Sequence, residues 1–160
     1  MRSKRARAVV AIAAVVTLSF GGVASAGYIL VSGKVNGDKL QRPGVFQAEV
    51  KTNNKGKPLK LNFIEFRARI LCGPPPSEPP LLLVLEQHMP VAKVQKQGKK
   101  YVFFSEEEGS ATMSGKISKN GKRLSGTAEF LTDLTADGYV GYDCDAKVRF
   151  NAKSIFVSGG

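Results

Sequence analysis

The sequence is poor in the residues on which most catalytic and metal sites depend. It contains one histidine, His88, and two cysteines, Cys72 and Cys144, and it has no Gly-x-Ser-x-Gly motif. A Ser-His-Asp site needs a histidine that is held by a carboxylate and faces a serine, and that motif would supply an exposed serine. Two cysteines and one histidine also lack the fourth ligand and the close spacing of a zinc site. We therefore expect no catalytic role for His88, no metal site and no cofactor.

Long apolar runs are also few. After the first 26 residues, no run reaches the roughly 20 residues that a membrane-spanning helix needs. Those first residues combine four early basic side chains, an apolar stretch and the small residues Ala24-Ser25-Ala26. This order predicts a secretory signal peptide over residues 1–26, with an uncleaved N-terminal anchor as the alternative. After cleavage, the mature chain is expected to be secreted and to have no membrane span.

Acidic residues are outnumbered by basic ones. The sequence has 24 basic and 13 acidic residues, and four of the basic ones lie in the predicted signal peptide, which leaves the mature chain with a formal charge of +7. Such a charge favours cell-wall polymers, lipid headgroups or nucleic acid as partners, although a solvated basic surface also keeps a protein soluble. Nucleic-acid binding calls for aromatic residues beside the charges. Here the aromatic residues fall on the apolar phase of the strands, so we expect no nucleic-acid partner.

The clearest local pattern surrounds Asn120-Gly121. Two runs of alternating apolar and polar residues flank this dipeptide, and a two-residue Asn-Gly loop with positive φ at both positions would fix their pairing. The expected pairs are Ile117 with Leu124, Gly115 with Gly126, Met113 with Ala128, and Ala111 with Phe130. The paired glycines leave a gap on the apolar face, which suits an aromatic ring from the opposing sheet, such as that of Phe66 or Phe150.

The sequence pattern predicts short strands along the whole mature chain. A third alternating run, from Val140 to Lys153, follows the Asn-Gly hairpin, and turn residues separate further runs upstream. Apolar and polar residues alternate along these runs and show no convincing helical period. This pattern predicts an antiparallel sheet with one buried face and one solvent-exposed face. We therefore expect one all-β domain over residues 27–160, folded as an antiparallel β-sandwich with one disulfide. A small, partly open β-barrel is the alternative.

Two features of the first half modify this pattern. Between Leu59 and Cys72 the apolar positions change from odd to even, which predicts a β-bulge near Phe63-Ile64 or a strand buried on both faces there. The proline-rich segment from Gly73 to Pro80 lacks the amide donors of a central strand and is predicted to be a stiff loop. The residues that follow, Leu81 to Leu85, are expected to form a strand rather than a short helix.

The two cysteines are expected to pair. Both Cys72 and Cys144 fall on the apolar phase of their runs, and two cysteines in an exported chain usually form a disulfide. The bridge would close a loop of about 73 residues and stabilise the fold by about 4 kcal/mol in the chain-entropy treatment.

Basic residues lie on the outward phase beside both cysteines. Those before Cys72 are Arg67 and Arg69, and those after Cys144 are Lys147, Arg149 and Lys153. If the disulfide sets the two strands near one another, these five side chains form one basic patch. Such a patch would suit an anionic surface.

Three segments carry a resemblance to a known family. They are the long strand that ends in Cys72-Gly73, the hairpin Ser114-Gly115 … Leu124-Ser125-Gly126-Thr127, and the strand with Cys144 and Val148-Arg149-Phe150-Asn151-Ala152. Over most of its mature length the chain resembles a family of small exported bacterial proteins of actinobacterial type. The resemblance implies a compact β-sandwich with one disulfide and no assigned activity. The proline-rich loop departs from the short connection that is usual in this family.

These patterns predict a secreted, non-catalytic binding domain or a domain associated with the cell envelope. Its expected partner is an anionic cell-wall polymer or a secreted protein. One alternative is a hydrolase of a polysaccharide or cell-wall polymer, which needs two opposed carboxylates. Another is an inhibitor of a secreted protease that presents the loop of residues 73–80.

Overall fold

The computed structural model describes residues 27–74, 78–132 and 140–158, so the predicted signal peptide lies outside the described residues. Among the residues that are described, there is no helix that could span a membrane. They form antiparallel strands, which are β1 (Tyr28–Gly37), β2 (Leu40–Thr52), β3 (Pro58–Cys72), β4 (Leu81–His88), β5 (Ala92–Gln97), β6 (Lys100–Glu107), β7 (Ala111–Ile117), β8 (Arg123–Phe130) and β9 (Ala146–Val157).

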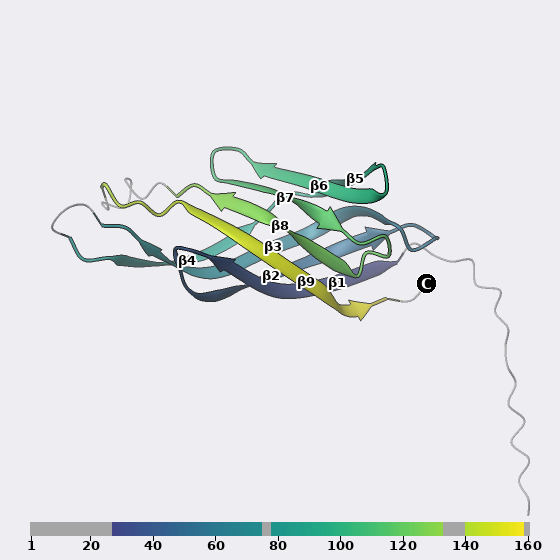
Figure 1. The fold of residues 1–160 in the computed structure, drawn as a ribbon, viewed down its shortest axis with the longest axis horizontal. Coiled ribbons are helices and arrows are strands. Elements are labelled where there is room, and N and C mark those ends of the chain that lie inside the picture. Colours follow the sequence, from purple (N-terminus) through teal and green to yellow (C-terminus); the bar gives the residue numbers. More distant parts are fainter. Residues whose placement is uncertain (1–26, 75–77, 133–139, 159–160) are drawn as a thin grey trace, which may run out of the picture.

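One continuous sheet contains all nine strands, and it closes on itself (Figure 1). Its order is β2-β1-β9-β8-β7-β6-β5-β3-β4, and the additional pairing of β2 with β3 joins eight of the strands into a barrel. The predicted all-β class is therefore confirmed. The sandwich is not confirmed, whereas the barrel alternative fits and is closed rather than partly open. Alternation along a strand specifies one buried face, but it does not say whether two sheets face each other or one sheet closes.

The long strand β3 makes this closure possible. Along one edge it pairs with β2, and along the other it pairs first with β5 and then with β4. Val50 pairs with Leu61 and Glu49 with Phe63, so Asn62 is an extra residue in β3. Both Leu61 and Ile64 are buried, while Phe63 is exposed. The predicted bulge is thus present, and it begins one residue before Phe63.

Strands β4 and β9 differ in how well they match the sequence pattern. The strand expected from Leu81 to Leu85 is confirmed as the first part of β4. The alternating run that begins at Val140 becomes a regular strand only at Ala146, where β9 starts. Before that point, Asp143 forms an isolated bridge with Gly73.

The β7–β8 hairpin has the predicted register but a different turn. All four expected apolar pairs are observed. The Gly121 amide donates to the Ser118 carbonyl at 2.8 Å, and Gly121 has a φ of 71°. The bond from Gly121 to Ser118 defines a β-turn of residues 118–121 in place of the expected two-residue Asn-Gly loop. The Asn120 side-chain oxygen supports this turn by accepting hydrogen bonds from the Ser118 hydroxyl and the Lys122 amide.

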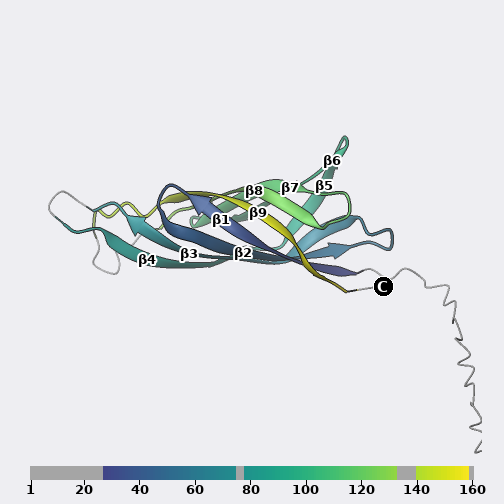
Figure 2. The same ribbon diagram turned by 60° about the horizontal axis from the view of Figure 1, so that its bottom comes forward.

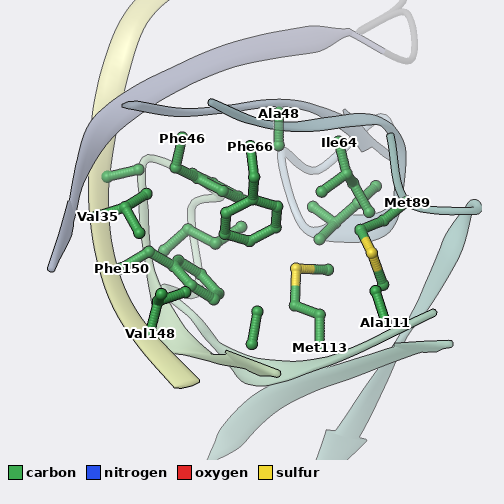
Figure 3. Packing of buried hydrophobic residues seen from close by; sticks show 14 of the residues in the cluster. Val35, Phe46, Ala48, Ile64, Phe66, Met89, Ala111, Met113, Val148 and Phe150 are labelled. Carbon is green, nitrogen blue, oxygen red and sulfur yellow. The ribbon is translucent and has the colours of Figure 1, made fainter. Parts of the chain in front are cut away.

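Aromatic, aliphatic and methionine side chains fill the interior of the barrel together (Figure 3). The Phe46 ring stacks on Phe150 with a centroid distance of 4.5 Å, and Phe66 meets Phe150 edge-on at 5.5 Å. A Cβ on Gly126 would lie 2.7 Å from the Phe150 ring, and a Cβ on Gly115 would lie 2.6 Å from Phe103. Phe150 is thus one of the two rings expected at the glycine pair, but it comes from the neighbouring strand β9 and not from an opposing sheet. The second ring is Phe103 of β6 rather than Phe66.

The disulfide closes one end of the barrel. Cys72 and Cys144 are bonded, as predicted, and their Cα atoms lie 4.4 Å apart. Directly beside them, Gly73 and Asp143 exchange two backbone hydrogen bonds of 2.9 Å. The last residue of β3 is thereby tied to the segment that precedes β9. We call this end the disulfide end.

Candidate anion-binding surface

Charged residues are divided between the two ends of the barrel. Opposite the disulfide end lies the basic end, which holds the β2–β3, β5–β6 and β7–β8 turns, the start of β1 and the end of β9. In Figure 1 the β2–β3 and β7–β8 hairpins and the end of β9 lie on the right, and in Figure 2 the β5–β6 hairpin projects upward on that side. The three turns and the residues beside them contain no acid, and their lysines are Lys55, Lys57, Lys99, Lys100, Lys119 and Lys122. The described connections of the disulfide end carry Asp38, Glu78, Glu108, Asp143 and Asp145.

Asparagine side chains shape two of the basic turns. Asn53 accepts hydrogen bonds of 2.9 Å from the amides of Lys55 and Lys57 through its side-chain oxygen. Gly56 between them has a φ of 68°, and a Cβ there would meet no atom within 4 Å. In the β7–β8 turn, the Asn120 side-chain oxygen likewise accepts a hydrogen bond from the amide of Lys122. The backbone of these lysines is therefore held in place, although the turns are exposed.

A pocket of about 730 Å³ opens between these two turns. Its polar lining comes from the asparagines and hydroxyl groups of the turns and of the chain ends, and its apolar lining includes Ile29 and Val157. The basic residues around it are Lys55, Lys57, Lys119 and Lys122. An apolar lining with several cationic groups suits an anion that also carries an apolar part.

A second basic surface covers one side of the barrel. It is formed by the outward residues of the neighbouring strands β7, β8, β9 and β1, and we call it the basic face. Its cations are Lys34, Lys116, Arg123, Lys147, Arg149 and Lys153, all of them exposed. Within these four strands the one acidic residue is Glu129, and it is bonded to Lys147. The other outward residues are mostly serine, threonine and asparagine.

Two like charges lie directly opposite one another on this face. Arg123 of β8 pairs in register with Lys153 of β9. A shallow hollow of about 350 Å³ lies beside them and is lined by both residues together with Lys116 and Asn151. Like charges at directly opposed positions destabilise a sheet. A bound anion would remove that repulsion.

The structure separates the five basic residues that were predicted to form one patch. Lys147, Arg149 and Lys153 belong to the basic face, whereas Arg67 and Arg69 lie on β3. Strands β1 and β2 stand between β9 and β3. The disulfide joins only the ends of the two segments, and the β1–β2 hairpin keeps the strands apart beyond that point. The two arginines and the three β9 residues therefore do not share one surface.

Arg67 belongs instead to an ion-pair cluster on β3 and β4. It donates to the buried carboxylate of Glu65, and its Nη2 atom lies 3.0 Å from Glu86 Oε1. The hydrogen bond from Arg67 to Glu65 raises the pKa of the guanidinium. Glu65, Glu86 and His88 also present possible metal ligands within 4.8 Å of one another. A cation would have to displace Arg67 from both carboxylates, so we interpret this cluster as an ion-pair network.

Another ion pair lies at the disulfide end. Lys39 Nζ lies 2.6 Å from Asp143 Oδ1, and the pKa of Asp143 is lowered, chiefly by its hydrogen bond to Lys39. Tyr142 donates a 3.0 Å hydrogen bond to the Pro79 carbonyl and so ties the proline-rich loop to this segment. Residues 75–77 of that loop, which was the candidate inhibitory loop, lie outside the described residues.

Sequence reasoning missed half of the basic face and all of the basic end. Lys34, Lys116 and Arg123 join the β9 residues only because β7, β8, β9 and β1 are neighbours in the closed sheet. The signal for the basic end was available, since each of three turns combines lysine pairs with a glycine and lacks acids. Only the strand directions show that these turns share one end.

The sequence was compared with protein-family models and with curated proteins. No protein-family model matches the chain, and no curated protein matches it significantly. The function is therefore inferred from the surfaces of the chain itself.

Proposed function

We propose that the mature domain is a secreted, non-catalytic binding protein of the cell envelope whose basic face binds an anionic envelope polymer. The observation that carries this proposal is the register of Arg123 opposite Lys153, within a face where one acid accompanies six cations. Such a face repels itself until anions neutralise it. Its charges spread over four strands, so it suits an extended polyanion better than a single small ion.

The spacing of the cations supports a linear ligand. Lys147, Arg149 and Lys153 lie on the same side of β9, where alternate residues are separated by about 7 Å along the strand. Asn151 completes the row and can donate hydrogen bonds between the charged positions. A polymer with regularly spaced phosphates or carboxylates can contact this row without any deep pocket.

Two further observations support an envelope location. The disulfide between Cys72 and Cys144 fits an oxidising compartment outside the cytoplasm. The N-terminal sequence fits an export signal. A charged partner in the cell wall would be within reach of a protein released on that side.

Co-sedimentation with lipid-free cell-wall fragments tests the proposal. The mature protein should sediment with fragments that retain their anionic polymers and stay in solution when those polymers have been extracted. Raising the salt from 0.1 M to 1 M shortens the Debye length from about 10 Å to about 3 Å, so binding should weaken strongly.

The variant Arg123→Gln/Lys153→Gln should bind the fragments about tenfold more weakly than the wild-type protein, because two opposed cations no longer meet the polyanion. Arg69→Gln/Lys93→Gln is the matched control, because it removes the same charge from exposed positions outside the basic face. Equal loss in both variants would mean that net charge alone drives binding, and it would overturn the assignment to this face. Cleavage of the polymer would favour the hydrolase alternative, and inhibition of a secreted protease would favour the inhibitor alternative.

A further inference from the structure

The basic end carries large apolar side chains that face solvent. Tyr28 is 40% exposed at the start of β1, and Ile155 and Phe156 are 60% and 61% exposed near the end of β9. Val157, which also lines the pocket of the basic end, is 46% exposed. We call these four residues the apolar rim. The apolar rim lies at the same end of the barrel as the lysines of the β2–β3 and β7–β8 turns.

A strand irregularity produces this exposure. Val31 pairs with Ser154 while Leu30 pairs with Phe156, so Ile155 is an extra residue in β9. In a regular strand, successive side chains alternate between the barrel interior and the solvent. The irregularity breaks that alternation, and three consecutive apolar side chains are exposed as a result. Bulges commonly re-aim side chains in this way.

Positive charge and apolar exposure coincide at this end of the barrel. The disulfide end also exposes apolar residues, such as Leu82 and Val84 on β4, but its described connections carry acids. The basic end has lysines and no acid in its turns. Gly27, the first residue after the predicted signal peptide, lines the pocket there. The chain therefore enters the domain at the end that is both basic and apolar.

We infer that the basic end docks on an anionic membrane surface. The apolar rim enters the interfacial layer of the bilayer, the lysines of the two turns contact the headgroups, and the pocket between the turns receives a headgroup phosphate. Interfacial proteins combine basic groups with exposed aromatic and aliphatic groups in this manner. This inference goes beyond the proposed function, because it concerns a different surface and a different partner.

A membrane fits these observations better than the wall polymer or a second copy of the chain. A hydrophilic polymer gains nothing from four exposed apolar side chains, whereas a lipid interface removes them from water. A second copy would bring the lysine turns of two basic ends together and would create repulsion. The pocket combines an apolar lining with cationic groups, as an amphiphilic anion requires.

Vesicle co-sedimentation tests the docking. The mature protein should bind vesicles of phosphatidylglycerol and phosphatidylcholine and should not bind vesicles of phosphatidylcholine alone. One lysine near an anionic surface contributes about fivefold to binding, so Lys119→Gln/Lys122→Gln should reduce binding about 25-fold. Ile155→Ser/Phe156→Ser should reduce it about tenfold or more without a change in charge. Leu82→Ser/Val84→Ser is the matched control at the disulfide end and should bind like the wild-type protein.

A tryptophan reporter tests insertion directly, because the sequence contains no tryptophan. Phe156→Trp places one indole on the apolar rim, and Val84→Trp places one at a similarly exposed position on β4. With anionic vesicles, the emission of Phe156→Trp should shift to shorter wavelength and be quenched by lipids brominated in the acyl chain. The emission of Val84→Trp should not change.

Several outcomes would overturn the inference. They are equal binding by the Ile155→Ser/Phe156→Ser variant, an unquenched Phe156→Trp emission, and complete competition by inorganic phosphate, which would mark the pocket as a site for a free anion. The wall fragments contain no bilayer, and the vesicles contain no wall polymer. Failure of the membrane inference is therefore distinguishable from failure of the proposed function.

Discussion

Arg123 and Lys153 face each other across β8 and β9, and both side chains are exposed. Their neighbours on the same face add positive charge, since Lys116 and Lys34 lie on the adjacent strands β7 and β1. The strand register is set by the buried partners Leu124 and Ala152, which pair directly beside them. Core packing therefore holds the two like charges together, and neither of them takes part in an ion pair with another described residue.

Removing one of these charges should stabilise the protein that has no ligand. Lys153→Gln is expected to raise the free energy of unfolding by roughly 0.2–1 kcal/mol at low salt, because it removes a directly opposed like charge. Urea unfolding at low and high salt measures the effect, which should shrink as salt screens the pair. Lys34→Gln is the control, since Lys34 pairs with the uncharged Asn151. An equal gain in both variants would mean that net charge, and not this pair, is responsible.

The glycine pair beneath the aromatic rings should not tolerate a side chain. A Cβ on Gly126 would lie 2.1 Å from the Ser114 carbonyl oxygen and 2.7 Å from the Phe150 ring. Gly126→Ala is therefore expected to cost about 1–3 kcal/mol of stability through overpacking. Gly73→Ala provides the comparison, because its Cβ would approach no atom closer than 3.9 Å. Thermal and urea unfolding of the two variants should differ clearly, and similar values would contradict the close approach at Gly126.

The disulfide should contribute a large share of the stability. It joins residues separated by 72 positions, so its loss in Cys72→Ala/Cys144→Ala is expected to cost about 4 kcal/mol through the greater freedom of the unfolded chain. Denaturant unfolding of this variant and of the oxidised wild-type protein measures the difference. Adding a reductant should destabilise the wild-type protein and leave the variant unchanged. A response of the variant to reductant would show that the agent acts elsewhere.

The ion pair between Lys39 and Asp143 should make stability depend on pH in the acid range. Lys39 holds the pKa of Asp143 below its usual value. A carboxyl group with a lowered pKa in the folded state contributes stability above its unfolded pKa and loses that contribution as the pH falls through its folded pKa. Asp143→Asn should therefore remove this part of the pH dependence. Lys39→Met should raise the pKa of Asp143 in an NMR titration of the carboxyl carbon, and an unchanged titration would show that Lys39 is not the cause.

The β7–β8 register, the bulge of β3 and the disulfide could be predicted from the sequence for physical reasons. Alternation in β7 and β8 specified the pairs from Ile117 with Leu124 to Ala111 with Phe130, because a slip of one residue would turn every apolar side chain outward. The change of phase between Leu59 and Cys72 located the bulge of β3 for the same reason. The two cysteines could pair only with one another, and both lay on the buried phase of their runs.

The arrangement of the charged surfaces could not be predicted from the sequence, because it depends on which strands become neighbours. Closure of the sheet through β2 and β3 decided between a sandwich and a barrel. The same closure placed β1 and β2 between β3 and β9, so Arg67 is separated from Arg149. The pairing of β9 with both β8 and β1 added Lys34, Lys116 and Arg123 to the basic face.

The sequence by itself determined the all-β class, the buried faces of the alternating runs, the β7–β8 register and the disulfide, because each depends on contacts that alternation or cysteine count already specifies. Only the tertiary structure decided that three lysine turns share one end of the barrel and that Arg123 stands opposite Lys153. Those relationships join residues on strands that are distant in sequence. They follow from which strands pair and in which direction each strand runs, and no local pattern specifies those pairings.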